Sequence, residues 1–257
     1  MSNNAAHTSI EELKQIVLDD KNYLNRLNFL HVNTRSLIHN IDNLHQLLCK
    51  LPKEPDIIFV TETKLNKRSN INFTHLDNYT FINKDSFSNA GGVGLYLKNS
   101  LKFEIRKDLN LINNDVESLW AKVQISKTQS ITIGVIYKHP NGNISEFTDL
   151  FNEILTKLNN EKLKCYIMGD LNINMLEKST KTAINKYSLM IKSTNFHNLI
   201  KLPTRITKTT ATCLDHFYTN YKESVINKFV LIDNLSDHLP ILGVINLKHK
   251  NKQPETM

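Results

Sequence analysis

Several apolar segments of this chain end on, or contain, a polar side chain of a type that takes part in catalysis. The segments are LNFLHV, IIFVT, ITIGVIYKHP, CYIMG, TCLDHFYTN and NLSDHLPIL. The polar side chains in or just after them are Asn33, Glu62, Tyr137, His139, Asp170, Asn172, Asp215, Asp237 and His238. Folds that combine strands and helices place binding sites at the carboxyl ends of strands, and solubility alone does not explain so many polar endings.

Metal-assisted hydrolysis of a phosphoester is the chemistry that fits this set of side chains. A hard divalent cation such as Mg²⁺ binds one or two carboxylates together with water and phosphate oxygens, and Glu62 is a good candidate ligand. A water molecule that attacks phosphorus needs a base, and Asp170 or His238 could serve. Asp215 is the natural carboxylate partner for His238, because a histidine poised by a carboxylate can offset charge on the phosphate.

Each of these side chains also has a simpler structural explanation when it is taken alone. Asn33 could cap a helix or lie in a turn, although its amide, like that of Asn172, could donate a hydrogen bond to a phosphate oxygen. Glu62 could be a solvated strand end, and the Asp170–Asn172 and Asp237–His238 pairs could be ordinary loops. The interpretation as one site therefore rests on their joint occurrence and order.

The elements that position these side chains are strands that often follow one another without an intervening helix. Strands are predicted from apolar runs and from β-branched and aromatic residues at 28–32, 57–60, 92–97, 119–123, 131–137, 166–168, 216–219, 228–231 and 241–247. Helices are predicted from helical spacing of apolar residues at 37–51, 147–158 and 183–190. This pattern predicts an α/β fold in which two mixed sheets pack together with helices outside.

The chain is expected to divide into a short extension, one large domain and a tail. Ser9 and Glu12 have the spacing of a capping box, and the apolar residues of 10–17 recur with helical period. The predicted regions are an N-terminal amphipathic helical extension at 1–26, the main domain at 27–248, and a disordered polar tail at 249–257.

Composition and charge favour a nucleic-acid partner over a membrane. The chain has 257 residues, of which 40% are hydrophobic, enough for a sizeable core. Its formal net charge of +7 favours a polyanionic partner. No signal peptide and no apolar run of membrane-spanning length is visible. We therefore expect an intracellular protein of the nucleus or cytoplasm that is neither secreted nor bound to a membrane.

The three cysteines are expected to be buried, reduced thiols. Cys49, Cys165 and Cys213 are odd in number, widely spaced and set in apolar sequence, so they predict no disulfide framework. Cys213 and His216 have a spacing seen in metal sites, but no second pair accompanies them, and zinc binding there is not favoured.

The ordered motifs NTRS, TETKL, IYKHPN, GDLNIN, LDHFYTN and SDHLPI resemble the endonuclease/exonuclease/phosphatase superfamily over about residues 27 to 247. Within it, the segments VNTRSLIHNIDNLHQLL and KLPTRITKTTATCLDHFYTN are most similar to the endonuclease domain of non-LTR (LINE-type) retrotransposons. The resemblance implies a DNase I-like fold, a four-layered α/β sandwich of two packed mixed β-sheets flanked by helices.

The resemblance also implies a role for each matching residue. It assigns the metal site to Asn33, Glu62 and Asp237, and catalysis to Tyr137, Asp170, Asn172, Asp215 and His238. Asp170 matches the aspartate that orients or activates water, and Asp215 matches the one that orients the catalytic histidine. The DNA-binding side chains are predicted to be Lys64, Arg68, His139, Asn141, Thr204, Arg205 and Lys208, with Lys67 and Lys201 also near the site.

The function implied is a DNA-nicking endonuclease of retrotransposon origin that uses Mg²⁺, with Mn²⁺ as a substitute. We expect DNA as the partner, no small-molecule cofactor, and a monomer. The chain ends before any reverse transcriptase, so it could be an excised domain, a truncated copy or a host-adopted gene. An apurinic/apyrimidinic repair endonuclease, a phosphoinositide phosphatase and an inactive DNA-binding remnant stay open as alternatives.

Overall fold

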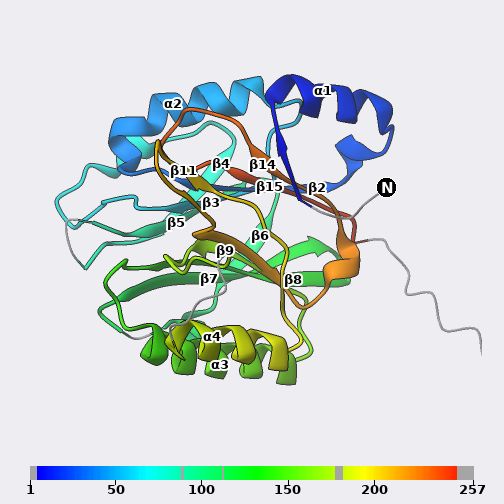
Figure 1. The fold of residues 1–257 in the computed structure, drawn as a ribbon. Helices are drawn as coiled ribbons and strands as arrows, with labels where there is room; N and C mark the ends of the chain where they lie inside the picture. Colours follow the sequence, from blue (N-terminus) through cyan, green and yellow to red (C-terminus); the bar gives the residue numbers. More distant parts are fainter. Residues whose placement is uncertain (1–4, 88–89, 112, 177–181, 248–257) are drawn as a thin grey trace, which may run out of the picture.

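A computed structural model describes residues 5–87, 90–111, 113–176 and 182–247 of the chain. Figure 1 shows four layers, in which two β-sheets pack face to face and a pair of helices covers the outer face of each sheet. The predicted α/β sandwich of two mixed sheets flanked by helices is confirmed. The tail expected at 249–257 lies outside the described residues.

The first sheet has seven strands, in both parallel and antiparallel pairs. In spatial order these are β1 (Ala6–Thr8), β14 (Val225–Leu231), β15 (Ile241–Ile245), β2 (Leu27–Asn33), β3 (Ile57–Thr61), β5 (Val93–Lys98) and β4 (Tyr79–Lys84). The β2–β3 pair in the middle is parallel. Both strands therefore end at the same edge of the sheet, where Asn33 is the last residue of β2.

The second sheet has six strands and is also mixed. In spatial order these are β10 (His197–Asn198), β13 (Asp215–Thr219), β9 (Cys165–Asp170), β8 (Gln129–Lys138), β7 (Val116–Ser126) and β6 (Lys102–Ile105). A separate two-stranded ribbon pairs β11 (Arg205–Ile206) with β12 (Ala211–Thr212). The parallel β8–β9 pair brings a second set of strand ends toward the site.

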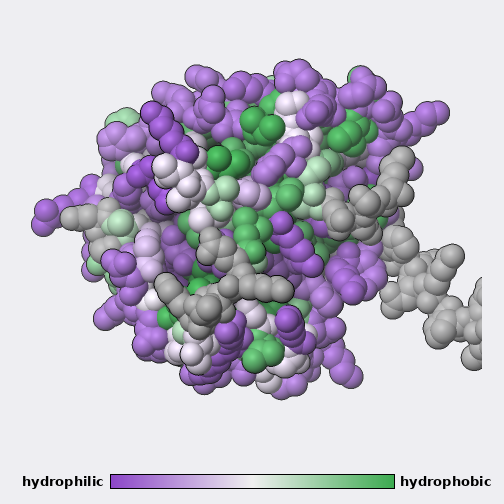
Figure 2. All heavy atoms as spheres, viewed as in Figure 1, coloured by the Kyte–Doolittle hydropathy of each residue, from purple (hydrophilic) through white to green (hydrophobic). Residues whose placement is uncertain are grey.

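Amphipathic helices close the sandwich on both sides. They are α1 (Ile10–Asp19) and α2 (Leu37–Lys50) on the first sheet, and α3 (Ile144–Asn160) and α4 (Thr182–Ser193) on the second. Leu13 and Leu44 are fully buried against the first sheet, and Phe147 and Phe151 against the second. Figure 2 shows that hydrophilic residues cover most of the outer faces of both helix layers.

Four short 3₁₀ turns complete the description, at Tyr23–Asn25 (η1), Ile71–Thr74 (η2), Lys107–Leu109 (η3) and Lys222–Ser224 (η4). The core between the sheets is apolar and partly aromatic. Phe29 packs edge-on against both Phe59 and Tyr166, with ring centroids 5.8 and 5.4 Å apart. Because such pairs hold the two sheets in register, they also fix the distance between the strand ends that carry the site.

The N-terminal segment joins the first sheet as well as forming a helix. The capping box of Ser9 and Glu12 is present at the start of α1. Before it, β1 pairs in parallel with β14, and its last residue, Thr8, is buried. The sequence analysis did not predict this strand, because three residues carry too little pattern to distinguish a strand from a loop.

The expectation about cysteines is met at two of the three positions. Cys165 and Cys213 are buried free thiols, but Cys49 is exposed near the end of α2, so the prediction of burial is wrong there. Its helix turns Cys49 toward solvent while Leu47 and Leu48 face the core. Among the described residues, no helix is both long and apolar enough to cross a membrane.

A buried chain of hydrogen bonds links α4 to β13. The hydroxyls of Tyr187 and Tyr218 lie 2.7 Å apart, and that of Tyr218 lies 2.7 Å from His216 Nδ1. His216 Nε2 lies 3.0 Å from the Ile173 carbonyl. A carbonyl only accepts, so Nε2 carries the proton and Nδ1 accepts from Tyr218. Burial lowers the pKa of His216 to about 4, and likewise the pKa of His31 to about 4.

Lowering the pH from 6.5 toward 4.5 should therefore reduce the free energy of unfolding. The folded-state pKa values of His31 and His216 lie below the unfolded value, so only the unfolded chain takes up these protons in that range. Each histidine contributes a slope of at most about 1.4 kcal/mol per pH unit. His216→Gln, which keeps a donor for the Ile173 carbonyl, should flatten the slope measured by urea unfolding.

The exposed His45 supplies the matched control for this measurement. His45→Gln should leave the slope as it is in the wild-type protein. If His216→Gln and wild type showed the same slope between pH 6.5 and 4.5, His216 would not be the buried neutral group described above.

Candidate active site

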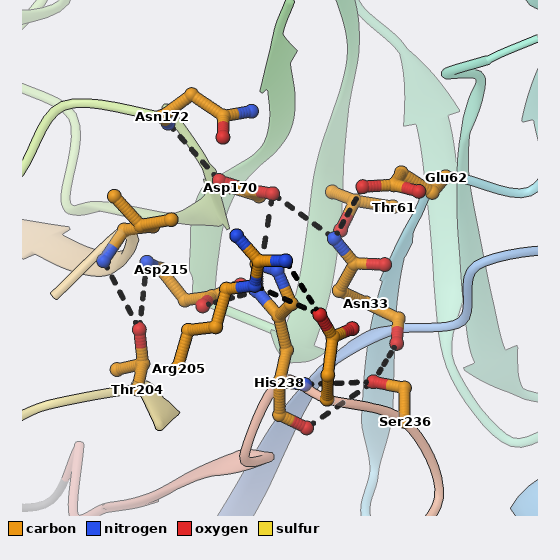
Figure 3. A network of polar contacts seen from close by, with 12 residues as sticks. Asn33, Thr61, Glu62, Asp170, Asn172, Thr204, Arg205, Asp215, Ser236 and His238 are labelled. Carbon is orange, nitrogen blue, oxygen red and sulfur yellow. Dashed lines mark hydrogen bonds and ion pairs between the residues drawn. The ribbon is translucent and has the colours of Figure 1, made fainter. Parts of the chain in front are cut away.

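Strand ends of both sheets bring the predicted side chains together at one place (Figure 3). Because β2 and β3 end together, Asn33 lies beside Glu62, the first residue after β3. In the second sheet, Asp170 at the end of β9 pairs with Asp215 at the start of β13 on one side and with Tyr137 of β8 on the other. The sheet pairing therefore places residues from distant parts of the chain in contact.

The amide of Asn33 joins the two sheets at this point. Its Nδ2 donates to Glu62 Oε1 at 2.9 Å and to Asp170 Oδ2 at 3.0 Å. Its Oδ1 accepts from the Arg35 backbone N–H at 3.1 Å. Since both ends of the amide are occupied, its nitrogen faces the two carboxylates and holds them close to each other.

His238 reaches this centre from the loop before β15. Its Nδ1 donates to Asp215 Oδ2 at 2.8 Å, and the same nitrogen lies 3.9 Å from Asp170 Oδ2. Asp170 and Asp215 are fully buried, and His238 is 5% exposed. With Nδ1 occupied by Asp215, the other ring nitrogen of His238 remains available for a bound molecule.

The pKa values of these groups follow from burial and from their neighbours. Burial and the Asp215 carboxylate raise the pKa of Asp170 to about 8. Burial opposes the charge on His238, but Asp215 outweighs it and raises the pKa of the imidazole to about 9. Burial likewise opposes the charge on Asp215, but His238 keeps its pKa below the ordinary value. His238 and Asp215 therefore form an ion pair at neutral pH.

The side chains present fit a hard divalent cation. Glu62, Asp170 and His238 each offer one ligand atom, and these atoms lie within 4.8 Å of one another. Within the described part of the chain this is the one such group found. Glu62 is only partly buried, which leaves room for water and phosphate oxygens, as Mg²⁺ requires. Of the three predicted ligands, only Glu62 belongs to the group.

The other two predicted ligands are placed differently. Asn33 presents its amide nitrogen to the carboxylates, so it positions ligands and does not itself bind a cation in this arrangement. Asp237 is held by two arginines. Arg35 Nη1 lies 3.0 Å from Asp237 Oδ1, and Arg205 Nε and Nη2 each lie 2.8 Å from Oδ2. The sequence analysis missed Arg35, although the NTRS motif contains it.

Tyr137 and Asn172 border the centre on the β8 side. Tyr137 is 2% exposed, and burial, with Glu62 and Asp170 nearby, raises the pKa of its phenol. Asn172 donates its backbone N–H to Asp170 Oδ1 at 3.0 Å and its amide to the Lys138 carbonyl at 2.8 Å. The amide of Asn172 is therefore fixed against β8, with one N–H left for another acceptor.

The backbone is unusual where these strands end. Glu62 and Asn172, the residues that begin the two central loops, both have φ of +50°. Arg35, Ser36 and Lys64 also have positive φ. For residues other than glycine this conformation costs free energy and persists only where surrounding structure enforces it. Here, Thr63 and Lys64 donate their N–H groups to Gly92 and Gly91, which fixes the loop after Glu62.

Gly169 sets the position of Asp170. A Cβ at this residue would lie 1.9 Å from the carbonyl oxygen of Ile136 in β8. No other residue type allows the strands to approach this closely without a backbone shift. The close approach brings Asp170 level with Tyr137 at the end of β8.

Two buried side chains hold Asp215 from behind. Thr204 was predicted to contact DNA, but it is fully buried, and its Oγ1 accepts the N–H groups of Leu214 and Asp215 at 3.1 and 3.0 Å. His31, which the sequence analysis missed, places Nδ1 3.8 Å from Asp215 Oδ1 and Nε2 3.2 Å from the Thr61 hydroxyl. Asp215 thus lies between two imidazoles, and Thr204 fixes its backbone rather than facing solvent.

The predicted DNA-binding side chains have diverse positions. Arg68, Asn141 and Lys208 are exposed, and Lys64 and Arg205 are partly exposed. His139 lies between Tyr137, with ring centroids 5.0 Å apart, and the buried Glu117, whose Oε1 is 3.1 Å from its Nε2. Lys201 instead lines a separate hollow of about 790 Å³ with His197, Lys222 and Lys228.

The lone Cys213–His216 spacing does not form a metal site. Cys213 Sγ lies 3.8 Å from the carbonyl oxygens of Ile200 and Asp215, and His216 is occupied by Tyr218 and Ile173. Both side chains therefore belong to the core, as the sequence analysis favoured.

Comparison with known proteins gives one family match and many similar folds. The sequence profile of the Endonuclease/Exonuclease/phosphatase family matches residues 27–238. No match is found among curated proteins. The endonuclease domain of TRAS1, a telomere-specific non-LTR retrotransposon, superposes with a TM-score of 0.67 at 14% identity, covering 87% of this chain and 100% of that one.

Two further solved structures show how widely this fold is used. The AP endonuclease LMAP from Leishmania major has a TM-score of 0.67 at 15% identity, covering 86% of this chain and 88% of its own. A mannosyl-6-phosphatase from Bacteroides thetaiotaomicron has a TM-score of 0.64 at 15% identity, covering 86% and 100%. At such identities the likeness shows a shared fold, and it leaves substrate choice to the site itself.

Proposed function

This chain belongs to the endonuclease/exonuclease/phosphatase family, and we propose that it is a divalent-metal-dependent endonuclease that hydrolyses a phosphodiester bond to nick DNA. The observation that carries the proposal is the group formed by Glu62, Asp170 and His238. It combines carboxylates for a cation with an imidazolium beside them, and phosphodiester hydrolysis needs both positive charge at the phosphate and a base for water.

DNA is the proposed substrate because the surroundings of the group are basic. The chain carries a net charge of +7, and Arg35 and Arg205 lie next to His238 with about half of each side chain exposed. Such groups bind the phosphates of a polyanion. The retrotransposon origin rests on the PTR and FYTN motifs and on the fold of the TRAS1 domain.

Repair of abasic DNA is the second candidate, because an AP endonuclease shares the fold over 86% of this chain. The two functions use the same chemistry and differ in the DNA that is cut. A nicking assay with intact and abasic duplexes separates them. Equal rates on both substrates support the first proposal, and cleavage confined to abasic DNA supports the second.

The proposed mechanism assigns one task to each side chain. Glu62 would hold the cation, which supplies positive charge to the phosphate oxygens when bound. Asn33 holds the Glu62 and Asp170 carboxylates at a fixed separation. Asp170 Oδ2 accepts the proton of the attacking water. These three side chains come from strands and strand ends, so little rearrangement is needed to reach the reactive geometry.

The remaining groups bind the phosphate. Asp215 keeps His238 protonated and oriented through Nδ1, so that Nε2–H can donate to a phosphate oxygen as negative charge grows. The phenol of Tyr137 and the free amide N–H of Asn172 supply further donors at the β8 side. Together these donors oppose the charge that builds up in the transition state.

Glu62→Gln should abolish most of the nicking activity at limiting Mg²⁺. The change keeps the shape of the side chain but removes a negative charge from the ligand group, so we expect a rate at least about 100-fold lower. Relaxation of supercoiled plasmid, measured with Mg²⁺, with Mn²⁺ and with EDTA, checks this result. Glu153→Gln on the exposed face of α3 is the matched control. A Glu62→Gln rate equal to wild type would contradict the assignment.

Asp237→Asn should weaken DNA binding without changing the metal requirement. Asp237 holds Arg35 and Arg205, so losing its charge should raise KM for DNA several-fold, while half-saturation by Mg²⁺ stays within about twofold. Steady-state nicking over a range of DNA and Mg²⁺ concentrations separates the two effects, with Asp149→Asn as control. A higher Mg²⁺ requirement at unchanged KM would make Asp237 a metal ligand instead.

A further inference from the structure

An exposed aromatic ring stands between two hollows beside the proposed site. Phe87, on the segment after β4, is 56% exposed. The ammonium of Lys84 lies 5.4 Å from the centre of its ring. The two side chains line both a hollow of about 1000 Å³ and a second one of about 680 Å³. Phe87 and Lys84 therefore form a ridge, and each hollow is within the size range of sites for small aromatic groups.

Buried contacts connect this ridge to the proposed catalytic groups. The backbone N–H of Phe87 donates to Glu117 Oε1 at 3.1 Å, and the same oxygen lies 3.1 Å from His139 Nε2. Glu117 is fully buried in β7 and pairs with Tyr137 of β8. The ridge thus has a fixed anchor next to Tyr137, so DNA held at the proposed site would pass close to Phe87.

The larger hollow is also suited to a nucleic-acid backbone. Lys67 and Arg68 line it together with Lys84, against one acidic side chain, Asp85. A turn holds the two exposed cations in place, because Asn66 Oδ1 accepts the Arg68 N–H at 2.9 Å. Clustered cations beside an exposed aromatic ring are the combination that binds unpaired nucleic acid, with phosphates on the cations and bases stacked on the ring.

We propose that Phe87 is a stacking platform for unpaired or unstacked DNA bases, and that Lys67, Arg68 and Lys84 hold the phosphates of the same strand. The inference rests on the proposed function and names its substrate class, which is DNA with locally open base pairs beside the cut. An exposed phenylalanine gains from covering its ring with a base, whereas a base in intact duplex has both faces already stacked.

The test compares affinity for two DNA duplexes of one length, one fully matched and one with a central four-nucleotide mismatch bubble. Binding is measured by fluorescence anisotropy in EDTA, so no turnover occurs. We expect the wild-type protein to bind the bubble about 10-fold more tightly, on the scale of one stacked base. Phe87→Ala should reduce that ratio to about twofold or less, while Phe87→Trp should retain it.

Phe73 provides the matched control, because it is 62% exposed and lines neither hollow. Phe73→Ala should keep the wild-type ratio. A wild-type protein without preference for the bubble, or a preference that survives in Phe87→Ala, would overturn the proposal. Plasmid nicking with Mg²⁺, run in parallel, tests the endonuclease function separately, since the affinity ratio does not depend on cleavage.

Discussion

The structure depends on holding three carboxylates of two different sheets within a few ångströms of one another. Glu62, Asp170 and Asp215 would repel one another there unless positive or hydrogen-bonding groups lay between them. The Asn33 amide donates to the first two, and the protonated His238 neutralises the third. A bound cation would complete the compensation, which explains why the group is arranged around a polar centre open to solvent at Glu62.

The fold supplies the rigidity that this arrangement needs. The parallel pairs β2–β3 and β8–β9 end at the same edge, and the close approach at Gly169 fixes the second of these ends. Left-handed backbone at Glu62 and Asn172 turns the chain sharply after each strand. Because strands rather than flexible loops carry the carboxylates, the polar groups stay in place and cost little ordering on binding.

The sequence predicted the strand-end residues because their signal is local, a polar side chain after an apolar run. It could not predict which groups pair across the fold. Asp237 resembled a ligand by its motif, yet Arg35 and Arg205 hold its carboxylate. Thr204 resembled a DNA contact, yet burial turns its hydroxyl to the Asp215 backbone. Short or half-exposed edge strands such as β1 and β4 carry weak patterns, since only one side of them meets the core.

A double-mutant cycle on His238 and Asp215 tests the central claim most directly, that compensated buried charges work as one unit. Plasmid nicking rates would be measured for His238→Ala, Asp215→Asn and the double variant, with folding checked by circular dichroism. We expect His238→Ala to lose about 100-fold or more, and the double variant to be little slower, because residues that act as a unit are not additive. A double loss equal to the product of the two single losses would show independent roles and contradict the account.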